Sequence, residues 1–281
     1  MLSSFLLATC LLTIPSQSRT LFAFERKQLT REYVASLPEE DRVLFAFEDQ
    51  FDAQSDTEAA NTTDKTCRYG PADGRWPSDK AWARLAKQLS TTTALIQTTP
   101  QAAPCYGTTK NDAKCQDLAK NWFDPNSHIG DPTEILSPVY QGLTCQPPSI
   151  YNSTSCTLGG YPSYVINVKE VLDIQLGINF VRNDNIRLVI KNTGHDFAGK
   201  SVGAGSLSIW THGLKDIQVI DNYVDDSGYE GPAIKAGAGV QALELYKAAS
   251  DKGYTVVAGE GQVRQCLLQG NISLIRGRLS V

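Results

Sequence analysis

The 281-residue sequence lacks the patterns that mark several large classes of protein. It has only three histidines, no Cys-x-x-Cys pair and no His-Glu-x-x-His helix, so nothing in it indicates a metal site. Lys and Arg number 26 against 30 Asp and Glu, and the net charge of −4 favours neither nucleic acid nor an anionic membrane as a partner. Internal repeats and low-complexity tracts are also missing.

Long hydrophobic runs are missing as well. No segment reaches the roughly 18 consecutive apolar residues of a membrane-spanning helix, so we expect a soluble mature chain. A shorter apolar run covers residues 5–14 and is followed by Pro15 and the small-x-small triplet Ser16-Gln17-Ser18. Residues 1–18 are therefore predicted to be a secretory signal peptide, although they contain no Lys or Arg.

The use of cysteine agrees with secretion into the extracellular space. Cys10 lies in the predicted signal, which leaves six of the seven cysteines: Cys67, Cys105, Cys115, Cys145, Cys156 and Cys266. Six cysteines allow many pairings, which the sequence alone does not distinguish. Glycosylation sequons begin at Asn61, Asn152 and Asn271. We expect an extracellular glycoprotein with disulfide bonds.

The chain is expected to divide near residue 158. In the first region, residues 19–158, a charged helical stretch at 24–51 is interrupted by Pro38. A further helix is predicted to begin after Ser78 as its N-cap, with three apolar residues on one face: Trp82, Leu85 and Leu89. Residues 91–158 are rich in Pro, Gly, Asn, Thr and Cys, which indicates irregular structure held by disulfides.

The second region, residues 159–281, alternates between strands and helices. Predicted strands cover 164–168, 186–191, 207–210, 217–220, 233–236 and 254–257. Predicted helices cover 169–183 and 241–251. This order of βαβ units with additional strands predicts an α+β cofactor-binding domain.

The most informative stretch is the turn that follows the strand at 186–191. Its candidate ligand-binding residues are Asn192, Thr193, Gly194, His195, Asp196, Phe197, Gly199, Lys200 and Ser201. The two glycines permit a turn with positive φ, whose N–H groups can form an anion-binding nest. Asn192 and Thr193 either bind a pyrophosphate or close the turn, and Asp196 either orients His195 or caps the turn. Lys200 adds a positive charge for a phosphate.

This stretch resembles the FAD-binding loop of secreted fungal FAD-linked oxidoreductases, the berberine-bridge-enzyme-like branch of the vanillyl-alcohol-oxidase (VAO) superfamily. The likeness runs from about Cys105 to Gln262. It implies an FAD-binding domain of the PCMH type, with the flavin attached to His195 through its 8α-methyl carbon. A neutral imidazole is a suitable nucleophile for such a bond. The resemblance also implies two disulfides, Cys105–Cys115 and Cys145–Cys156.

A glycine-rich turn farther along the chain supports a rival interpretation. Residues 237–242 read Gly-Ala-Gly-Val-Gln-Ala, and Glu260 follows about twenty residues later, as in a nicotinamide-dinucleotide fingerprint. Only one strand and about twenty residues follow that helix, too few to complete a doubly wound sheet. The flavin family has a matching turn that packs on the cofactor, which makes Gly237, Gly239 and Val240 candidate flavin contacts.

The other two histidines are weaker candidates. His212 lies at the end of the strand at 207–210, and we interpret it as structural rather than as a catalytic base. His128 lies in a segment rich in Asp, Asn and Pro and belongs to no motif.

The resemblance implies a definite chemistry. A small-molecule alcohol or related C–H group gives a hydride to the flavin, and O₂ reoxidises it. Many relatives carry a second tether on a cysteine in a Gly-Glu-Cys segment, but this chain reads Gly259-Glu260-Gly261, and Cys266 does not match that position. We therefore expect a single covalent bond.

The resemblance ends after Gln262, so we expect this sequence to lack the substrate domain, which in the family normally holds the catalytic base. Gln262-Val263-Arg264 is compatible with an exon end read into an intron, so we expect a truncated or mis-spliced gene model. The alternative function is a non-catalytic fragment that binds flavin weakly or not at all.

Overall fold

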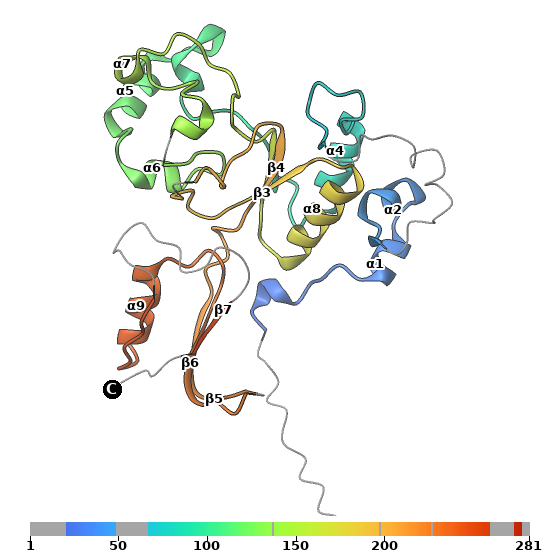
Figure 1. Cartoon of the computed structure of the whole chain (residues 1–281), viewed down its shortest axis with the longest axis vertical. Coiled ribbons are helices and arrows are strands. Elements are labelled where there is room, and N and C mark those ends of the chain that lie inside the picture. The colour runs from blue at the N-terminus through green and yellow to red at the C-terminus, as the bar shows by residue number, and fades with distance from the viewer. Residues whose placement is uncertain are drawn as a thin grey trace, which may run out of the picture.

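The computed structural model describes residues 21–48, 67–136, 138–196, 198–225, 227–258 and 273–276. Two β-sheets organise this part of the chain (Figure 1). The first sheet lies between a group of N-terminal helices and a disulfide-containing module, and the second carries helix α9 (Ala242–Ser250). Helices and strands alternate as the sequence predicts for an α+β fold.

The first sheet joins three parallel strands to one antiparallel edge strand. In spatial order its strands are β1 (Leu95–Gln97), β2 (Tyr164–Asn167), β4 (Ser206–Trp210) and β3 (Arg187–Lys191). Helix α8 (Val171–Asn183) connects β2 to β3, and β4 pairs between them. The predictions for β2, α8, β3 and β4 are confirmed to within two residues at each end. Their β-branched and apolar runs are typical of elements that pack into a hydrophobic core.

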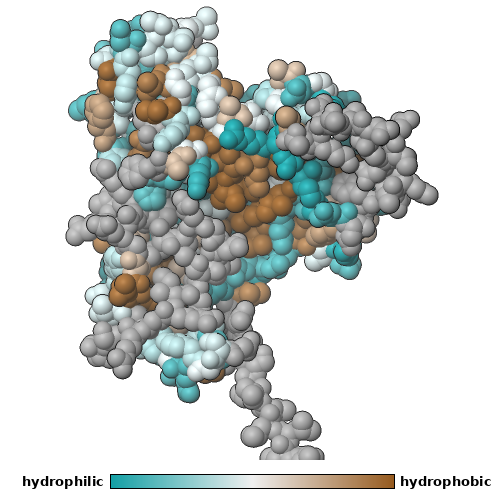
Figure 2. All heavy atoms as spheres, viewed as in Figure 1, coloured by the Kyte–Doolittle hydropathy of each residue, from teal (hydrophilic) through white to brown (hydrophobic). Residues whose placement is uncertain are grey.

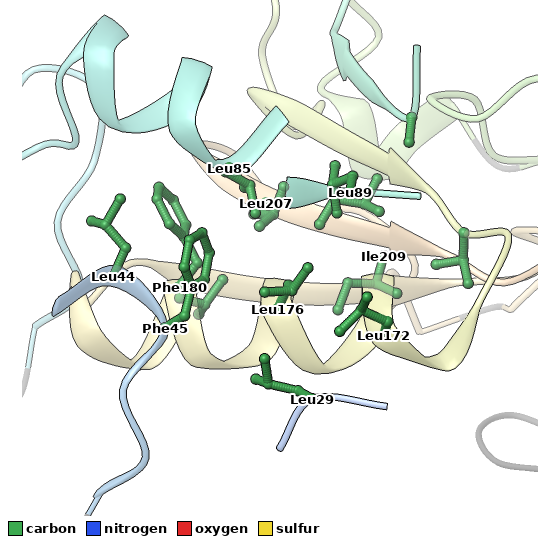
Figure 3. Close-up of a cluster of buried hydrophobic side chains, with 14 of the residues drawn as sticks. Leu29, Leu44, Phe45, Leu85, Leu89, Leu172, Leu176, Phe180, Leu207 and Ile209 are labelled. Atoms are coloured by element: carbon green, nitrogen blue, oxygen red, sulfur yellow. The ribbon is translucent and has the colours of Figure 1, made fainter. Parts of the chain in front are cut away.

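The largest hydrophobic core contains residues from both predicted regions (Figure 3). Phe45 of α2 (Glu39–Phe45), Leu85 of α4 (Asp79–Gln88) and Phe180 of α8 all have no exposed surface. The N-terminal helices therefore cover α8 and the sheet rather than forming a core of their own. The predicted boundary near residue 158 stays a prediction about chain organisation.

The predicted interruption of the N-terminal helical stretch at Pro38 is confirmed, but the described helices cover only parts of the predicted range 24–51. Helix α1 (Arg31–Ser36) ends before Pro38, and α2 starts directly after that proline. The Ser78 hydroxyl oxygen accepts a hydrogen bond from the N–H of Ala81 at 3.3 Å, which confirms the predicted N-cap of α4. Short 3₁₀ turns lie at Ala23–Glu25, Ala103–Cys105, Gly107–Thr109 and Pro138–Gln141.

A buried carboxylate that the sequence analysis did not single out joins α8 to the segment after α4. Asp173 is fully buried and accepts hydrogen bonds from the N–H and the hydroxyl of Ser90, both at 2.7 Å. The N–H of Lys169 donates to the same carboxylate at 2.9 Å. A negative charge here also suits the N-terminal end of the α8 helix dipole.

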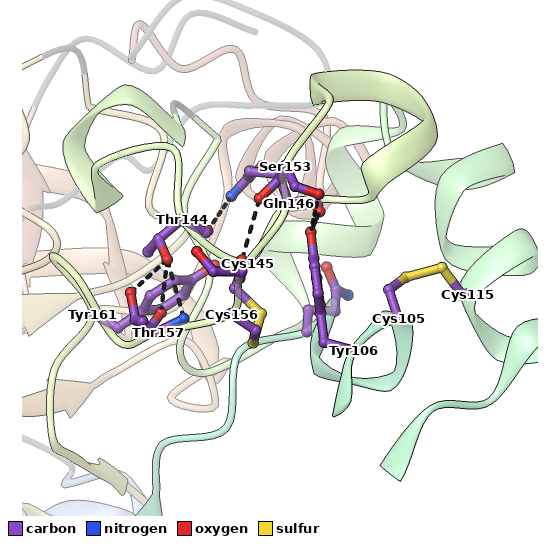
Figure 4. Close-up of a disulfide and its surroundings, with 12 residues drawn as sticks. Cys105, Tyr106, Cys115, Thr144, Cys145, Gln146, Ser153, Cys156, Thr157 and Tyr161 are labelled. Atoms are coloured by element: carbon purple, nitrogen blue, oxygen red, sulfur yellow. Dashed lines mark hydrogen bonds between the residues drawn. A yellow bond between two sulfur atoms is a disulfide. The ribbon is translucent and has the colours of Figure 1, made fainter. Parts of the chain in front are cut away.

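The module between β1 and β2 is more regular than predicted (Figure 4). It contains α5 (Asp112–Asn121), α6 (Pro125–Ile129) and α7 (Pro148–Tyr151), where irregular structure was expected. Helix α5 has no buried residue, so it lacks the apolar periodicity by which a helix is recognised. The disulfides implied by the resemblance, Cys105–Cys115 and Cys145–Cys156, are both present, with Cα–Cα distances of 4.9 and 3.8 Å.

The second sheet is antiparallel, with the order β5 (Ile217–Val224), β6 (Glu230–Ala236) and β7 (Ser273–Arg276). Helix α9 packs on it through a small core, and the helix prediction is confirmed. The predicted strand at 254–257 is wrong, because only Thr255 forms a single bridge there. Strand β7 was not predicted from the sequence.

Candidate functional site

A hollow of about 360 Å³ opens where β3 and β4 end. Because these strands are parallel, their carboxyl ends lie at the same edge of the sheet, where α/β proteins bind ligands. Six of the candidate residues line the hollow: Asn192, Thr193, Gly194, His195, Lys200 and Ser201. The remaining lining is mostly apolar and comes from Leu188, Val189, Ile190 and Thr211. The structure thus brings together residues that the sequence placed in one turn.

His195 is half-buried at this hollow. Its Nδ1 lies 2.9 Å from the Thr193 hydroxyl oxygen, which fixes the plane of the ring. Burial lowers the pKa of His195, and the nearby charge of Asp196 opposes this only in part. The imidazole is therefore neutral at pH 7, the form in which it is a nucleophile.

Asp196 engages the loop that follows His195. Its carboxylate accepts hydrogen bonds from the N–H groups of Ala198 at 3.0 Å, Lys200 at 2.9 Å and Ser201 at 3.1 Å. The hydroxyl of Ser201 donates to it as well. These N–H groups are the ones expected to form an anion-binding nest, and the loop's own carboxylate fills that position. Asp196 caps the turn. Phe197 lies outside the described residues.

The residues 199–203 spell Gly-Lys-Ser-Val-Gly, which matches the Gly-x-Ser-x-Gly pattern of a hydrolase elbow. The geometry does not match that elbow, because no helix follows Ser201 and the next element is β4. The Ser201 hydroxyl donates to Asp196 rather than to a histidine. We therefore do not assign this serine a nucleophilic role.

Two glycines in the loop meet steric and conformational demands. Gly194 has φ +77° and Gly199 has φ +66°, values that side chains rarely adopt. A Cβ on Gly194 would lie 3.0 Å from a methyl carbon of Ile135, and one on Gly199 would lie 2.5 Å from the ring of Tyr140. The loop is thus packed against a segment of the disulfide-containing module.

Asn192 links the loop to the glycine-rich turn at residues 237–239. Its side-chain amide donates to the carbonyl of Ala238, and its Oδ1 lies 2.8 Å from Nδ1 of His212. Burial, with the charges of Lys215 and Lys191, lowers the pKa of His212 to about 4. His212 is therefore a neutral hydrogen-bond partner, in agreement with its interpretation as structural.

The glycines of that turn are required by protein packing. A Cβ on Gly237 would lie 2.3 Å from the carbonyl oxygen of Leu214, and one on Gly239 would lie 2.3 Å from that of His212. Their N–H groups donate to the carbonyls of Asp216 at 2.8 Å and of Leu214 at 2.9 Å. Close packing against backbone therefore explains why both positions are glycine, without any contact to a ligand. They do not line the hollow, and neither does Val240, which is buried in the core under α9.

The nicotinamide interpretation fails on the same observations. The strand that leads into the turn, β6, pairs antiparallel with both of its neighbours. A dinucleotide fingerprint requires a parallel strand and glycine N–H groups directed at phosphate. Glu260 lies outside the described residues.

His128 occupies a buried position away from the hollow. It lies in α6, and its Nε2 is 2.7 Å from the carbonyl oxygen of Trp122. Burial alone would lower the pKa of His128, but the nearby Glu134 carboxylate and the Trp122 carbonyl outweigh it, so the pKa is raised. The sequence analysis did not single out Glu134.

Two negative findings apply to the described ranges alone. Within them, no group of three or more His, Cys, Asp or Glu residues could hold a metal ion. No helix in these ranges is long and apolar enough to cross a membrane.

Comparison with known proteins shows which kind of domain contains the His195 loop. Residues 162–274 match the FAD binding domain family, a range that runs from β2 into β7 and includes the whole His195 loop. The chain contains an FAD binding domain. Its relatives include a VAO-type flavoprotein oxidase of Thermothelomyces thermophilus, 42% identical over 198 residues, and an FAD-linked oxidoreductase of Neocamarosporium betae, 43% identical over 201 residues.

Solved structures agree with this identification. The crystal structure of a VAO-type flavoprotein from Myceliophthora thermophila is 41% identical, has a TM-score of 0.64 and covers 69% of this chain. The predicted fold class and the predicted family of fungal FAD-linked oxidoreductases are confirmed. The chain spans about one third of the length of these proteins: 34% and 33% of the two relatives and 35% of the solved chain.

Proposed function

We propose that this chain is the FAD-binding part of an oxidoreductase and that it holds the flavin covalently through His195. The observation that supports this most directly is a neutral, half-buried imidazole at the edge of an open hollow inside an FAD binding domain. Within the described residues, His195 is the histidine that lines this hollow.

The residues present fit a flavin. Leu188 and Ile190, which precede the loop in the chain, offer an apolar surface for a ring system. Lys200, near the end of the loop, offers a positive charge for a phosphate. A hollow of about 360 Å³ is at the small end of ligand pockets, so it suits part of a dinucleotide rather than all of it. The candidate contacts Gly237, Gly239 and Val240 do not line the hollow, and their turn is joined to the His195 loop by the hydrogen bond from Asn192 to the carbonyl of Ala238.

The proposed chemistry assigns separate tasks to these side chains. A bound flavin supplies a hydride acceptor for an alcohol or related C–H group of a small molecule, with O₂ as the final acceptor and hydrogen peroxide as the product. Thr193 orients the His195 ring, and Asp196 holds the shape of the following loop. A bond between His195 and the 8α carbon of a flavin would form with loss of one hydrogen from each partner, and the flavin and then O₂ would accept the two electrons. We assign no catalytic base to the residues of the hollow.

Acid precipitation of the flavin-loaded protein tests this proposal. The wild-type pellet should stay yellow, and its His195 peptide should gain the mass of FAD. His195→Ala should release all flavin into the supernatant. The matched control is Lys200→Ala, which should weaken FAD binding but keep the bound fraction acid-stable. A colourless wild-type pellet, or a His195→Ala pellet that keeps its colour, would overturn the covalent assignment.

A second candidate function is a fragment that binds FAD weakly or not at all. It is favoured by hydrophobic surface near the middle of the molecule, in the region of β3 and α8 (Figure 2). Ile190, beside the hollow, is 49% exposed. Titration with FAD, followed by quenching of flavin fluorescence, separates the two candidates, because a fragment of this kind shows no saturable quenching.

We also propose that the protein is secreted and glycosylated at Asn152. Asn152 begins a sequon and is exposed at the end of α7, close to the disulfide Cys145–Cys156. We expect an N-glycosidase to increase the mobility of protein secreted from a eukaryotic host. Asn152→Gln should abolish that part of the shift, and an unchanged shift would place the glycan elsewhere. The sequons at Asn61 and Asn271 and the predicted signal peptide lie outside the described residues.

A further inference from the structure

A buried carboxylate lies close to the His195 loop but outside the hollow. Glu134 has no exposed surface, and its Oε1 accepts hydrogen bonds from the Tyr161 hydroxyl at 2.7 Å and the N–H of Gln101 at 3.2 Å. Its Oε2 accepts from the side-chain amide of Gln141 at 3.2 Å. Tyr161 and Gln141 are also fully buried. A buried charge is costly unless it is fully hydrogen-bonded, so its position is strongly determined.

The backbone around Glu134 contacts one side of the His195 turn. The N–H of Leu136 donates to the carbonyl of Gly194 at 3.0 Å, directly before His195 in the chain. The carbonyl oxygen of Glu134 and a methyl carbon of Ile135 lie 3.1 and 3.0 Å from the position a Cβ on Gly194 would take. Nothing larger than glycine fits between this segment and the turn without a shift.

The residue next to Gln141 contacts the other side of the same loop. The ring of Tyr140 packs on Gly199, close enough that a Cβ there would lie 2.5 Å from it. Gln141 is held by Glu134 through the hydrogen bond described above. One carboxylate therefore anchors two contacts, at Gly194 and at Gly199, that lie on either side of His195 in the chain.

We propose that Glu134 is a positioning residue that holds the His195 loop in the geometry needed for flavin attachment. The importance of Glu134 for flavin attachment rests on the proposed function. The positioning of the loop by Glu134 does not, because it is a property of the chain without flavin. The Asp196 carboxylate shapes the loop from within, and Glu134 fixes its place relative to the sheet. In Glu134→Gln an amide NH₂ replaces one of the two acceptor oxygens, which leaves at least one buried donor without an acceptor and frees the loop to open.

The test measures the reactivity of His195 in the flavin-free 281-residue chain. Diethyl pyrocarbonate modifies neutral imidazoles, and peptide mass analysis gives a separate rate for each of the three histidines. Glu134→Gln should increase the rate at His195 about tenfold, the size expected for loss of a hydrogen bond to a buried charge. The rate at His212, which is held by Asn192, should not change.

Two further variants complete the design. Asp112→Asn is the matched control, an exposed carboxylate in the same module, and should leave every rate unchanged. Tyr140→Ala changes a partly exposed residue, so it should fold even if Glu134→Gln does not. It removes the packing of the Tyr140 ring on Gly199 but leaves Glu134 and its hydrogen bonds in place, so it should raise the His195 rate by a smaller factor.

The outcomes separate positioning from general destabilisation. An unchanged His195 rate in both Glu134→Gln and Tyr140→Ala would overturn the proposal, as would equal acceleration at His195 and His212. In flavin-loaded protein, Glu134→Gln should also lower the acid-stable flavin fraction. If the wild-type chain takes up no flavin, the proposed function fails, while the reactivity of His195 still decides the positioning role.

Discussion

The carboxylate of Asp196 accepts hydrogen bonds from N–H groups of its own loop, and these bonds make the stability of the loop depend on pH. Burial alone would raise the pKa of Asp196, but hydrogen bonds from Ser201, Lys200 and Ala198 outweigh it and lower the pKa. A lowered pKa in the folded protein means that the charge stabilises the fold above the ordinary value of 3.8. That stabilisation is lost as the pH falls through the lowered value.

Asp196→Asn should therefore be destabilising near neutral pH and neutral in acid. We expect the free energy of unfolding to fall by about 1 kcal/mol at about pH 7, because the side chain is only partly buried and solvent screens its charge. The difference from wild type should shrink as the pH falls below 3.8 and should vanish only in acid below the lowered pKa of Asp196, where both side chains are uncharged. Urea denaturation near neutral pH and in that acid range measures this. An equal loss at both would mean that the charge does not hold the loop.

At the scale of elements, the turn at residues 237–239 joins the two sheets. It leads from β6 to α9 and packs its glycines on the connection between β4 and β5. The sequence pattern there is compatible with a nucleotide-binding turn, but the contacts belong to a tightly packed join between elements. The glycine composition thus has two possible physical causes, close approach to a ligand or close approach to backbone.

A pair of glycine substitutions tests this assignment. Gly239→Ala should lower the free energy of unfolding by about 2–3 kcal/mol, because its Cβ meets the His212 carbonyl oxygen at 2.3 Å. Gly74→Ala is the control, since its Cβ would meet nothing within 4 Å and no positive φ is required. It should be neutral or slightly stabilising. If Gly239→Ala weakened FAD binding without changing thermal unfolding, the turn would be a ligand contact after all.

At the scale of the whole molecule, the disulfide-containing module supports the cofactor site from outside the sheet. Its segment 131–136 touches the His195 turn, and the side-chain amine of Lys191 donates to the carbonyl of Asp131. The two disulfides close loops of 10 and 11 residues within that module (Figure 4). Oxidation state and site geometry should therefore be coupled.

The double variant Cys145→Ser/Cys156→Ser tests that coupling. Loss of a crosslink over a short loop should lower the free energy of unfolding by about 2–3 kcal/mol. The His195 modification rate should also rise, because the support of its turn loosens. Cys67→Ser removes a free, exposed cysteine and should change neither quantity. A stable double variant with an unchanged His195 rate would show that the module and the site are independent.

Much of the site could be predicted from local patterns. The strand before His195, the positive-φ glycines and the polar composition of the loop all occur within residues 186–201. Glu134 could not be predicted, because its role depends on Tyr161 and Gly194, which lie 27 and 60 positions away in the chain. Helix α5 was missed for a different reason: it buries no side chain, so its sequence has no apolar stripe.

The sequence predicted the α+β order of elements and the histidine in a glycine turn from patterns among neighbouring residues. The family resemblance that these patterns support predicted the flavin and the two short disulfides. Only the tertiary structure showed that N–H groups of the loop already donate to Asp196 instead of to a ligand. It also showed why residues 237 and 239 must be glycine and that the buried carboxylate of Glu134 supports the His195 loop. Those outcomes depend on contacts between distant segments, whose distances and burial exist only after the chain has packed.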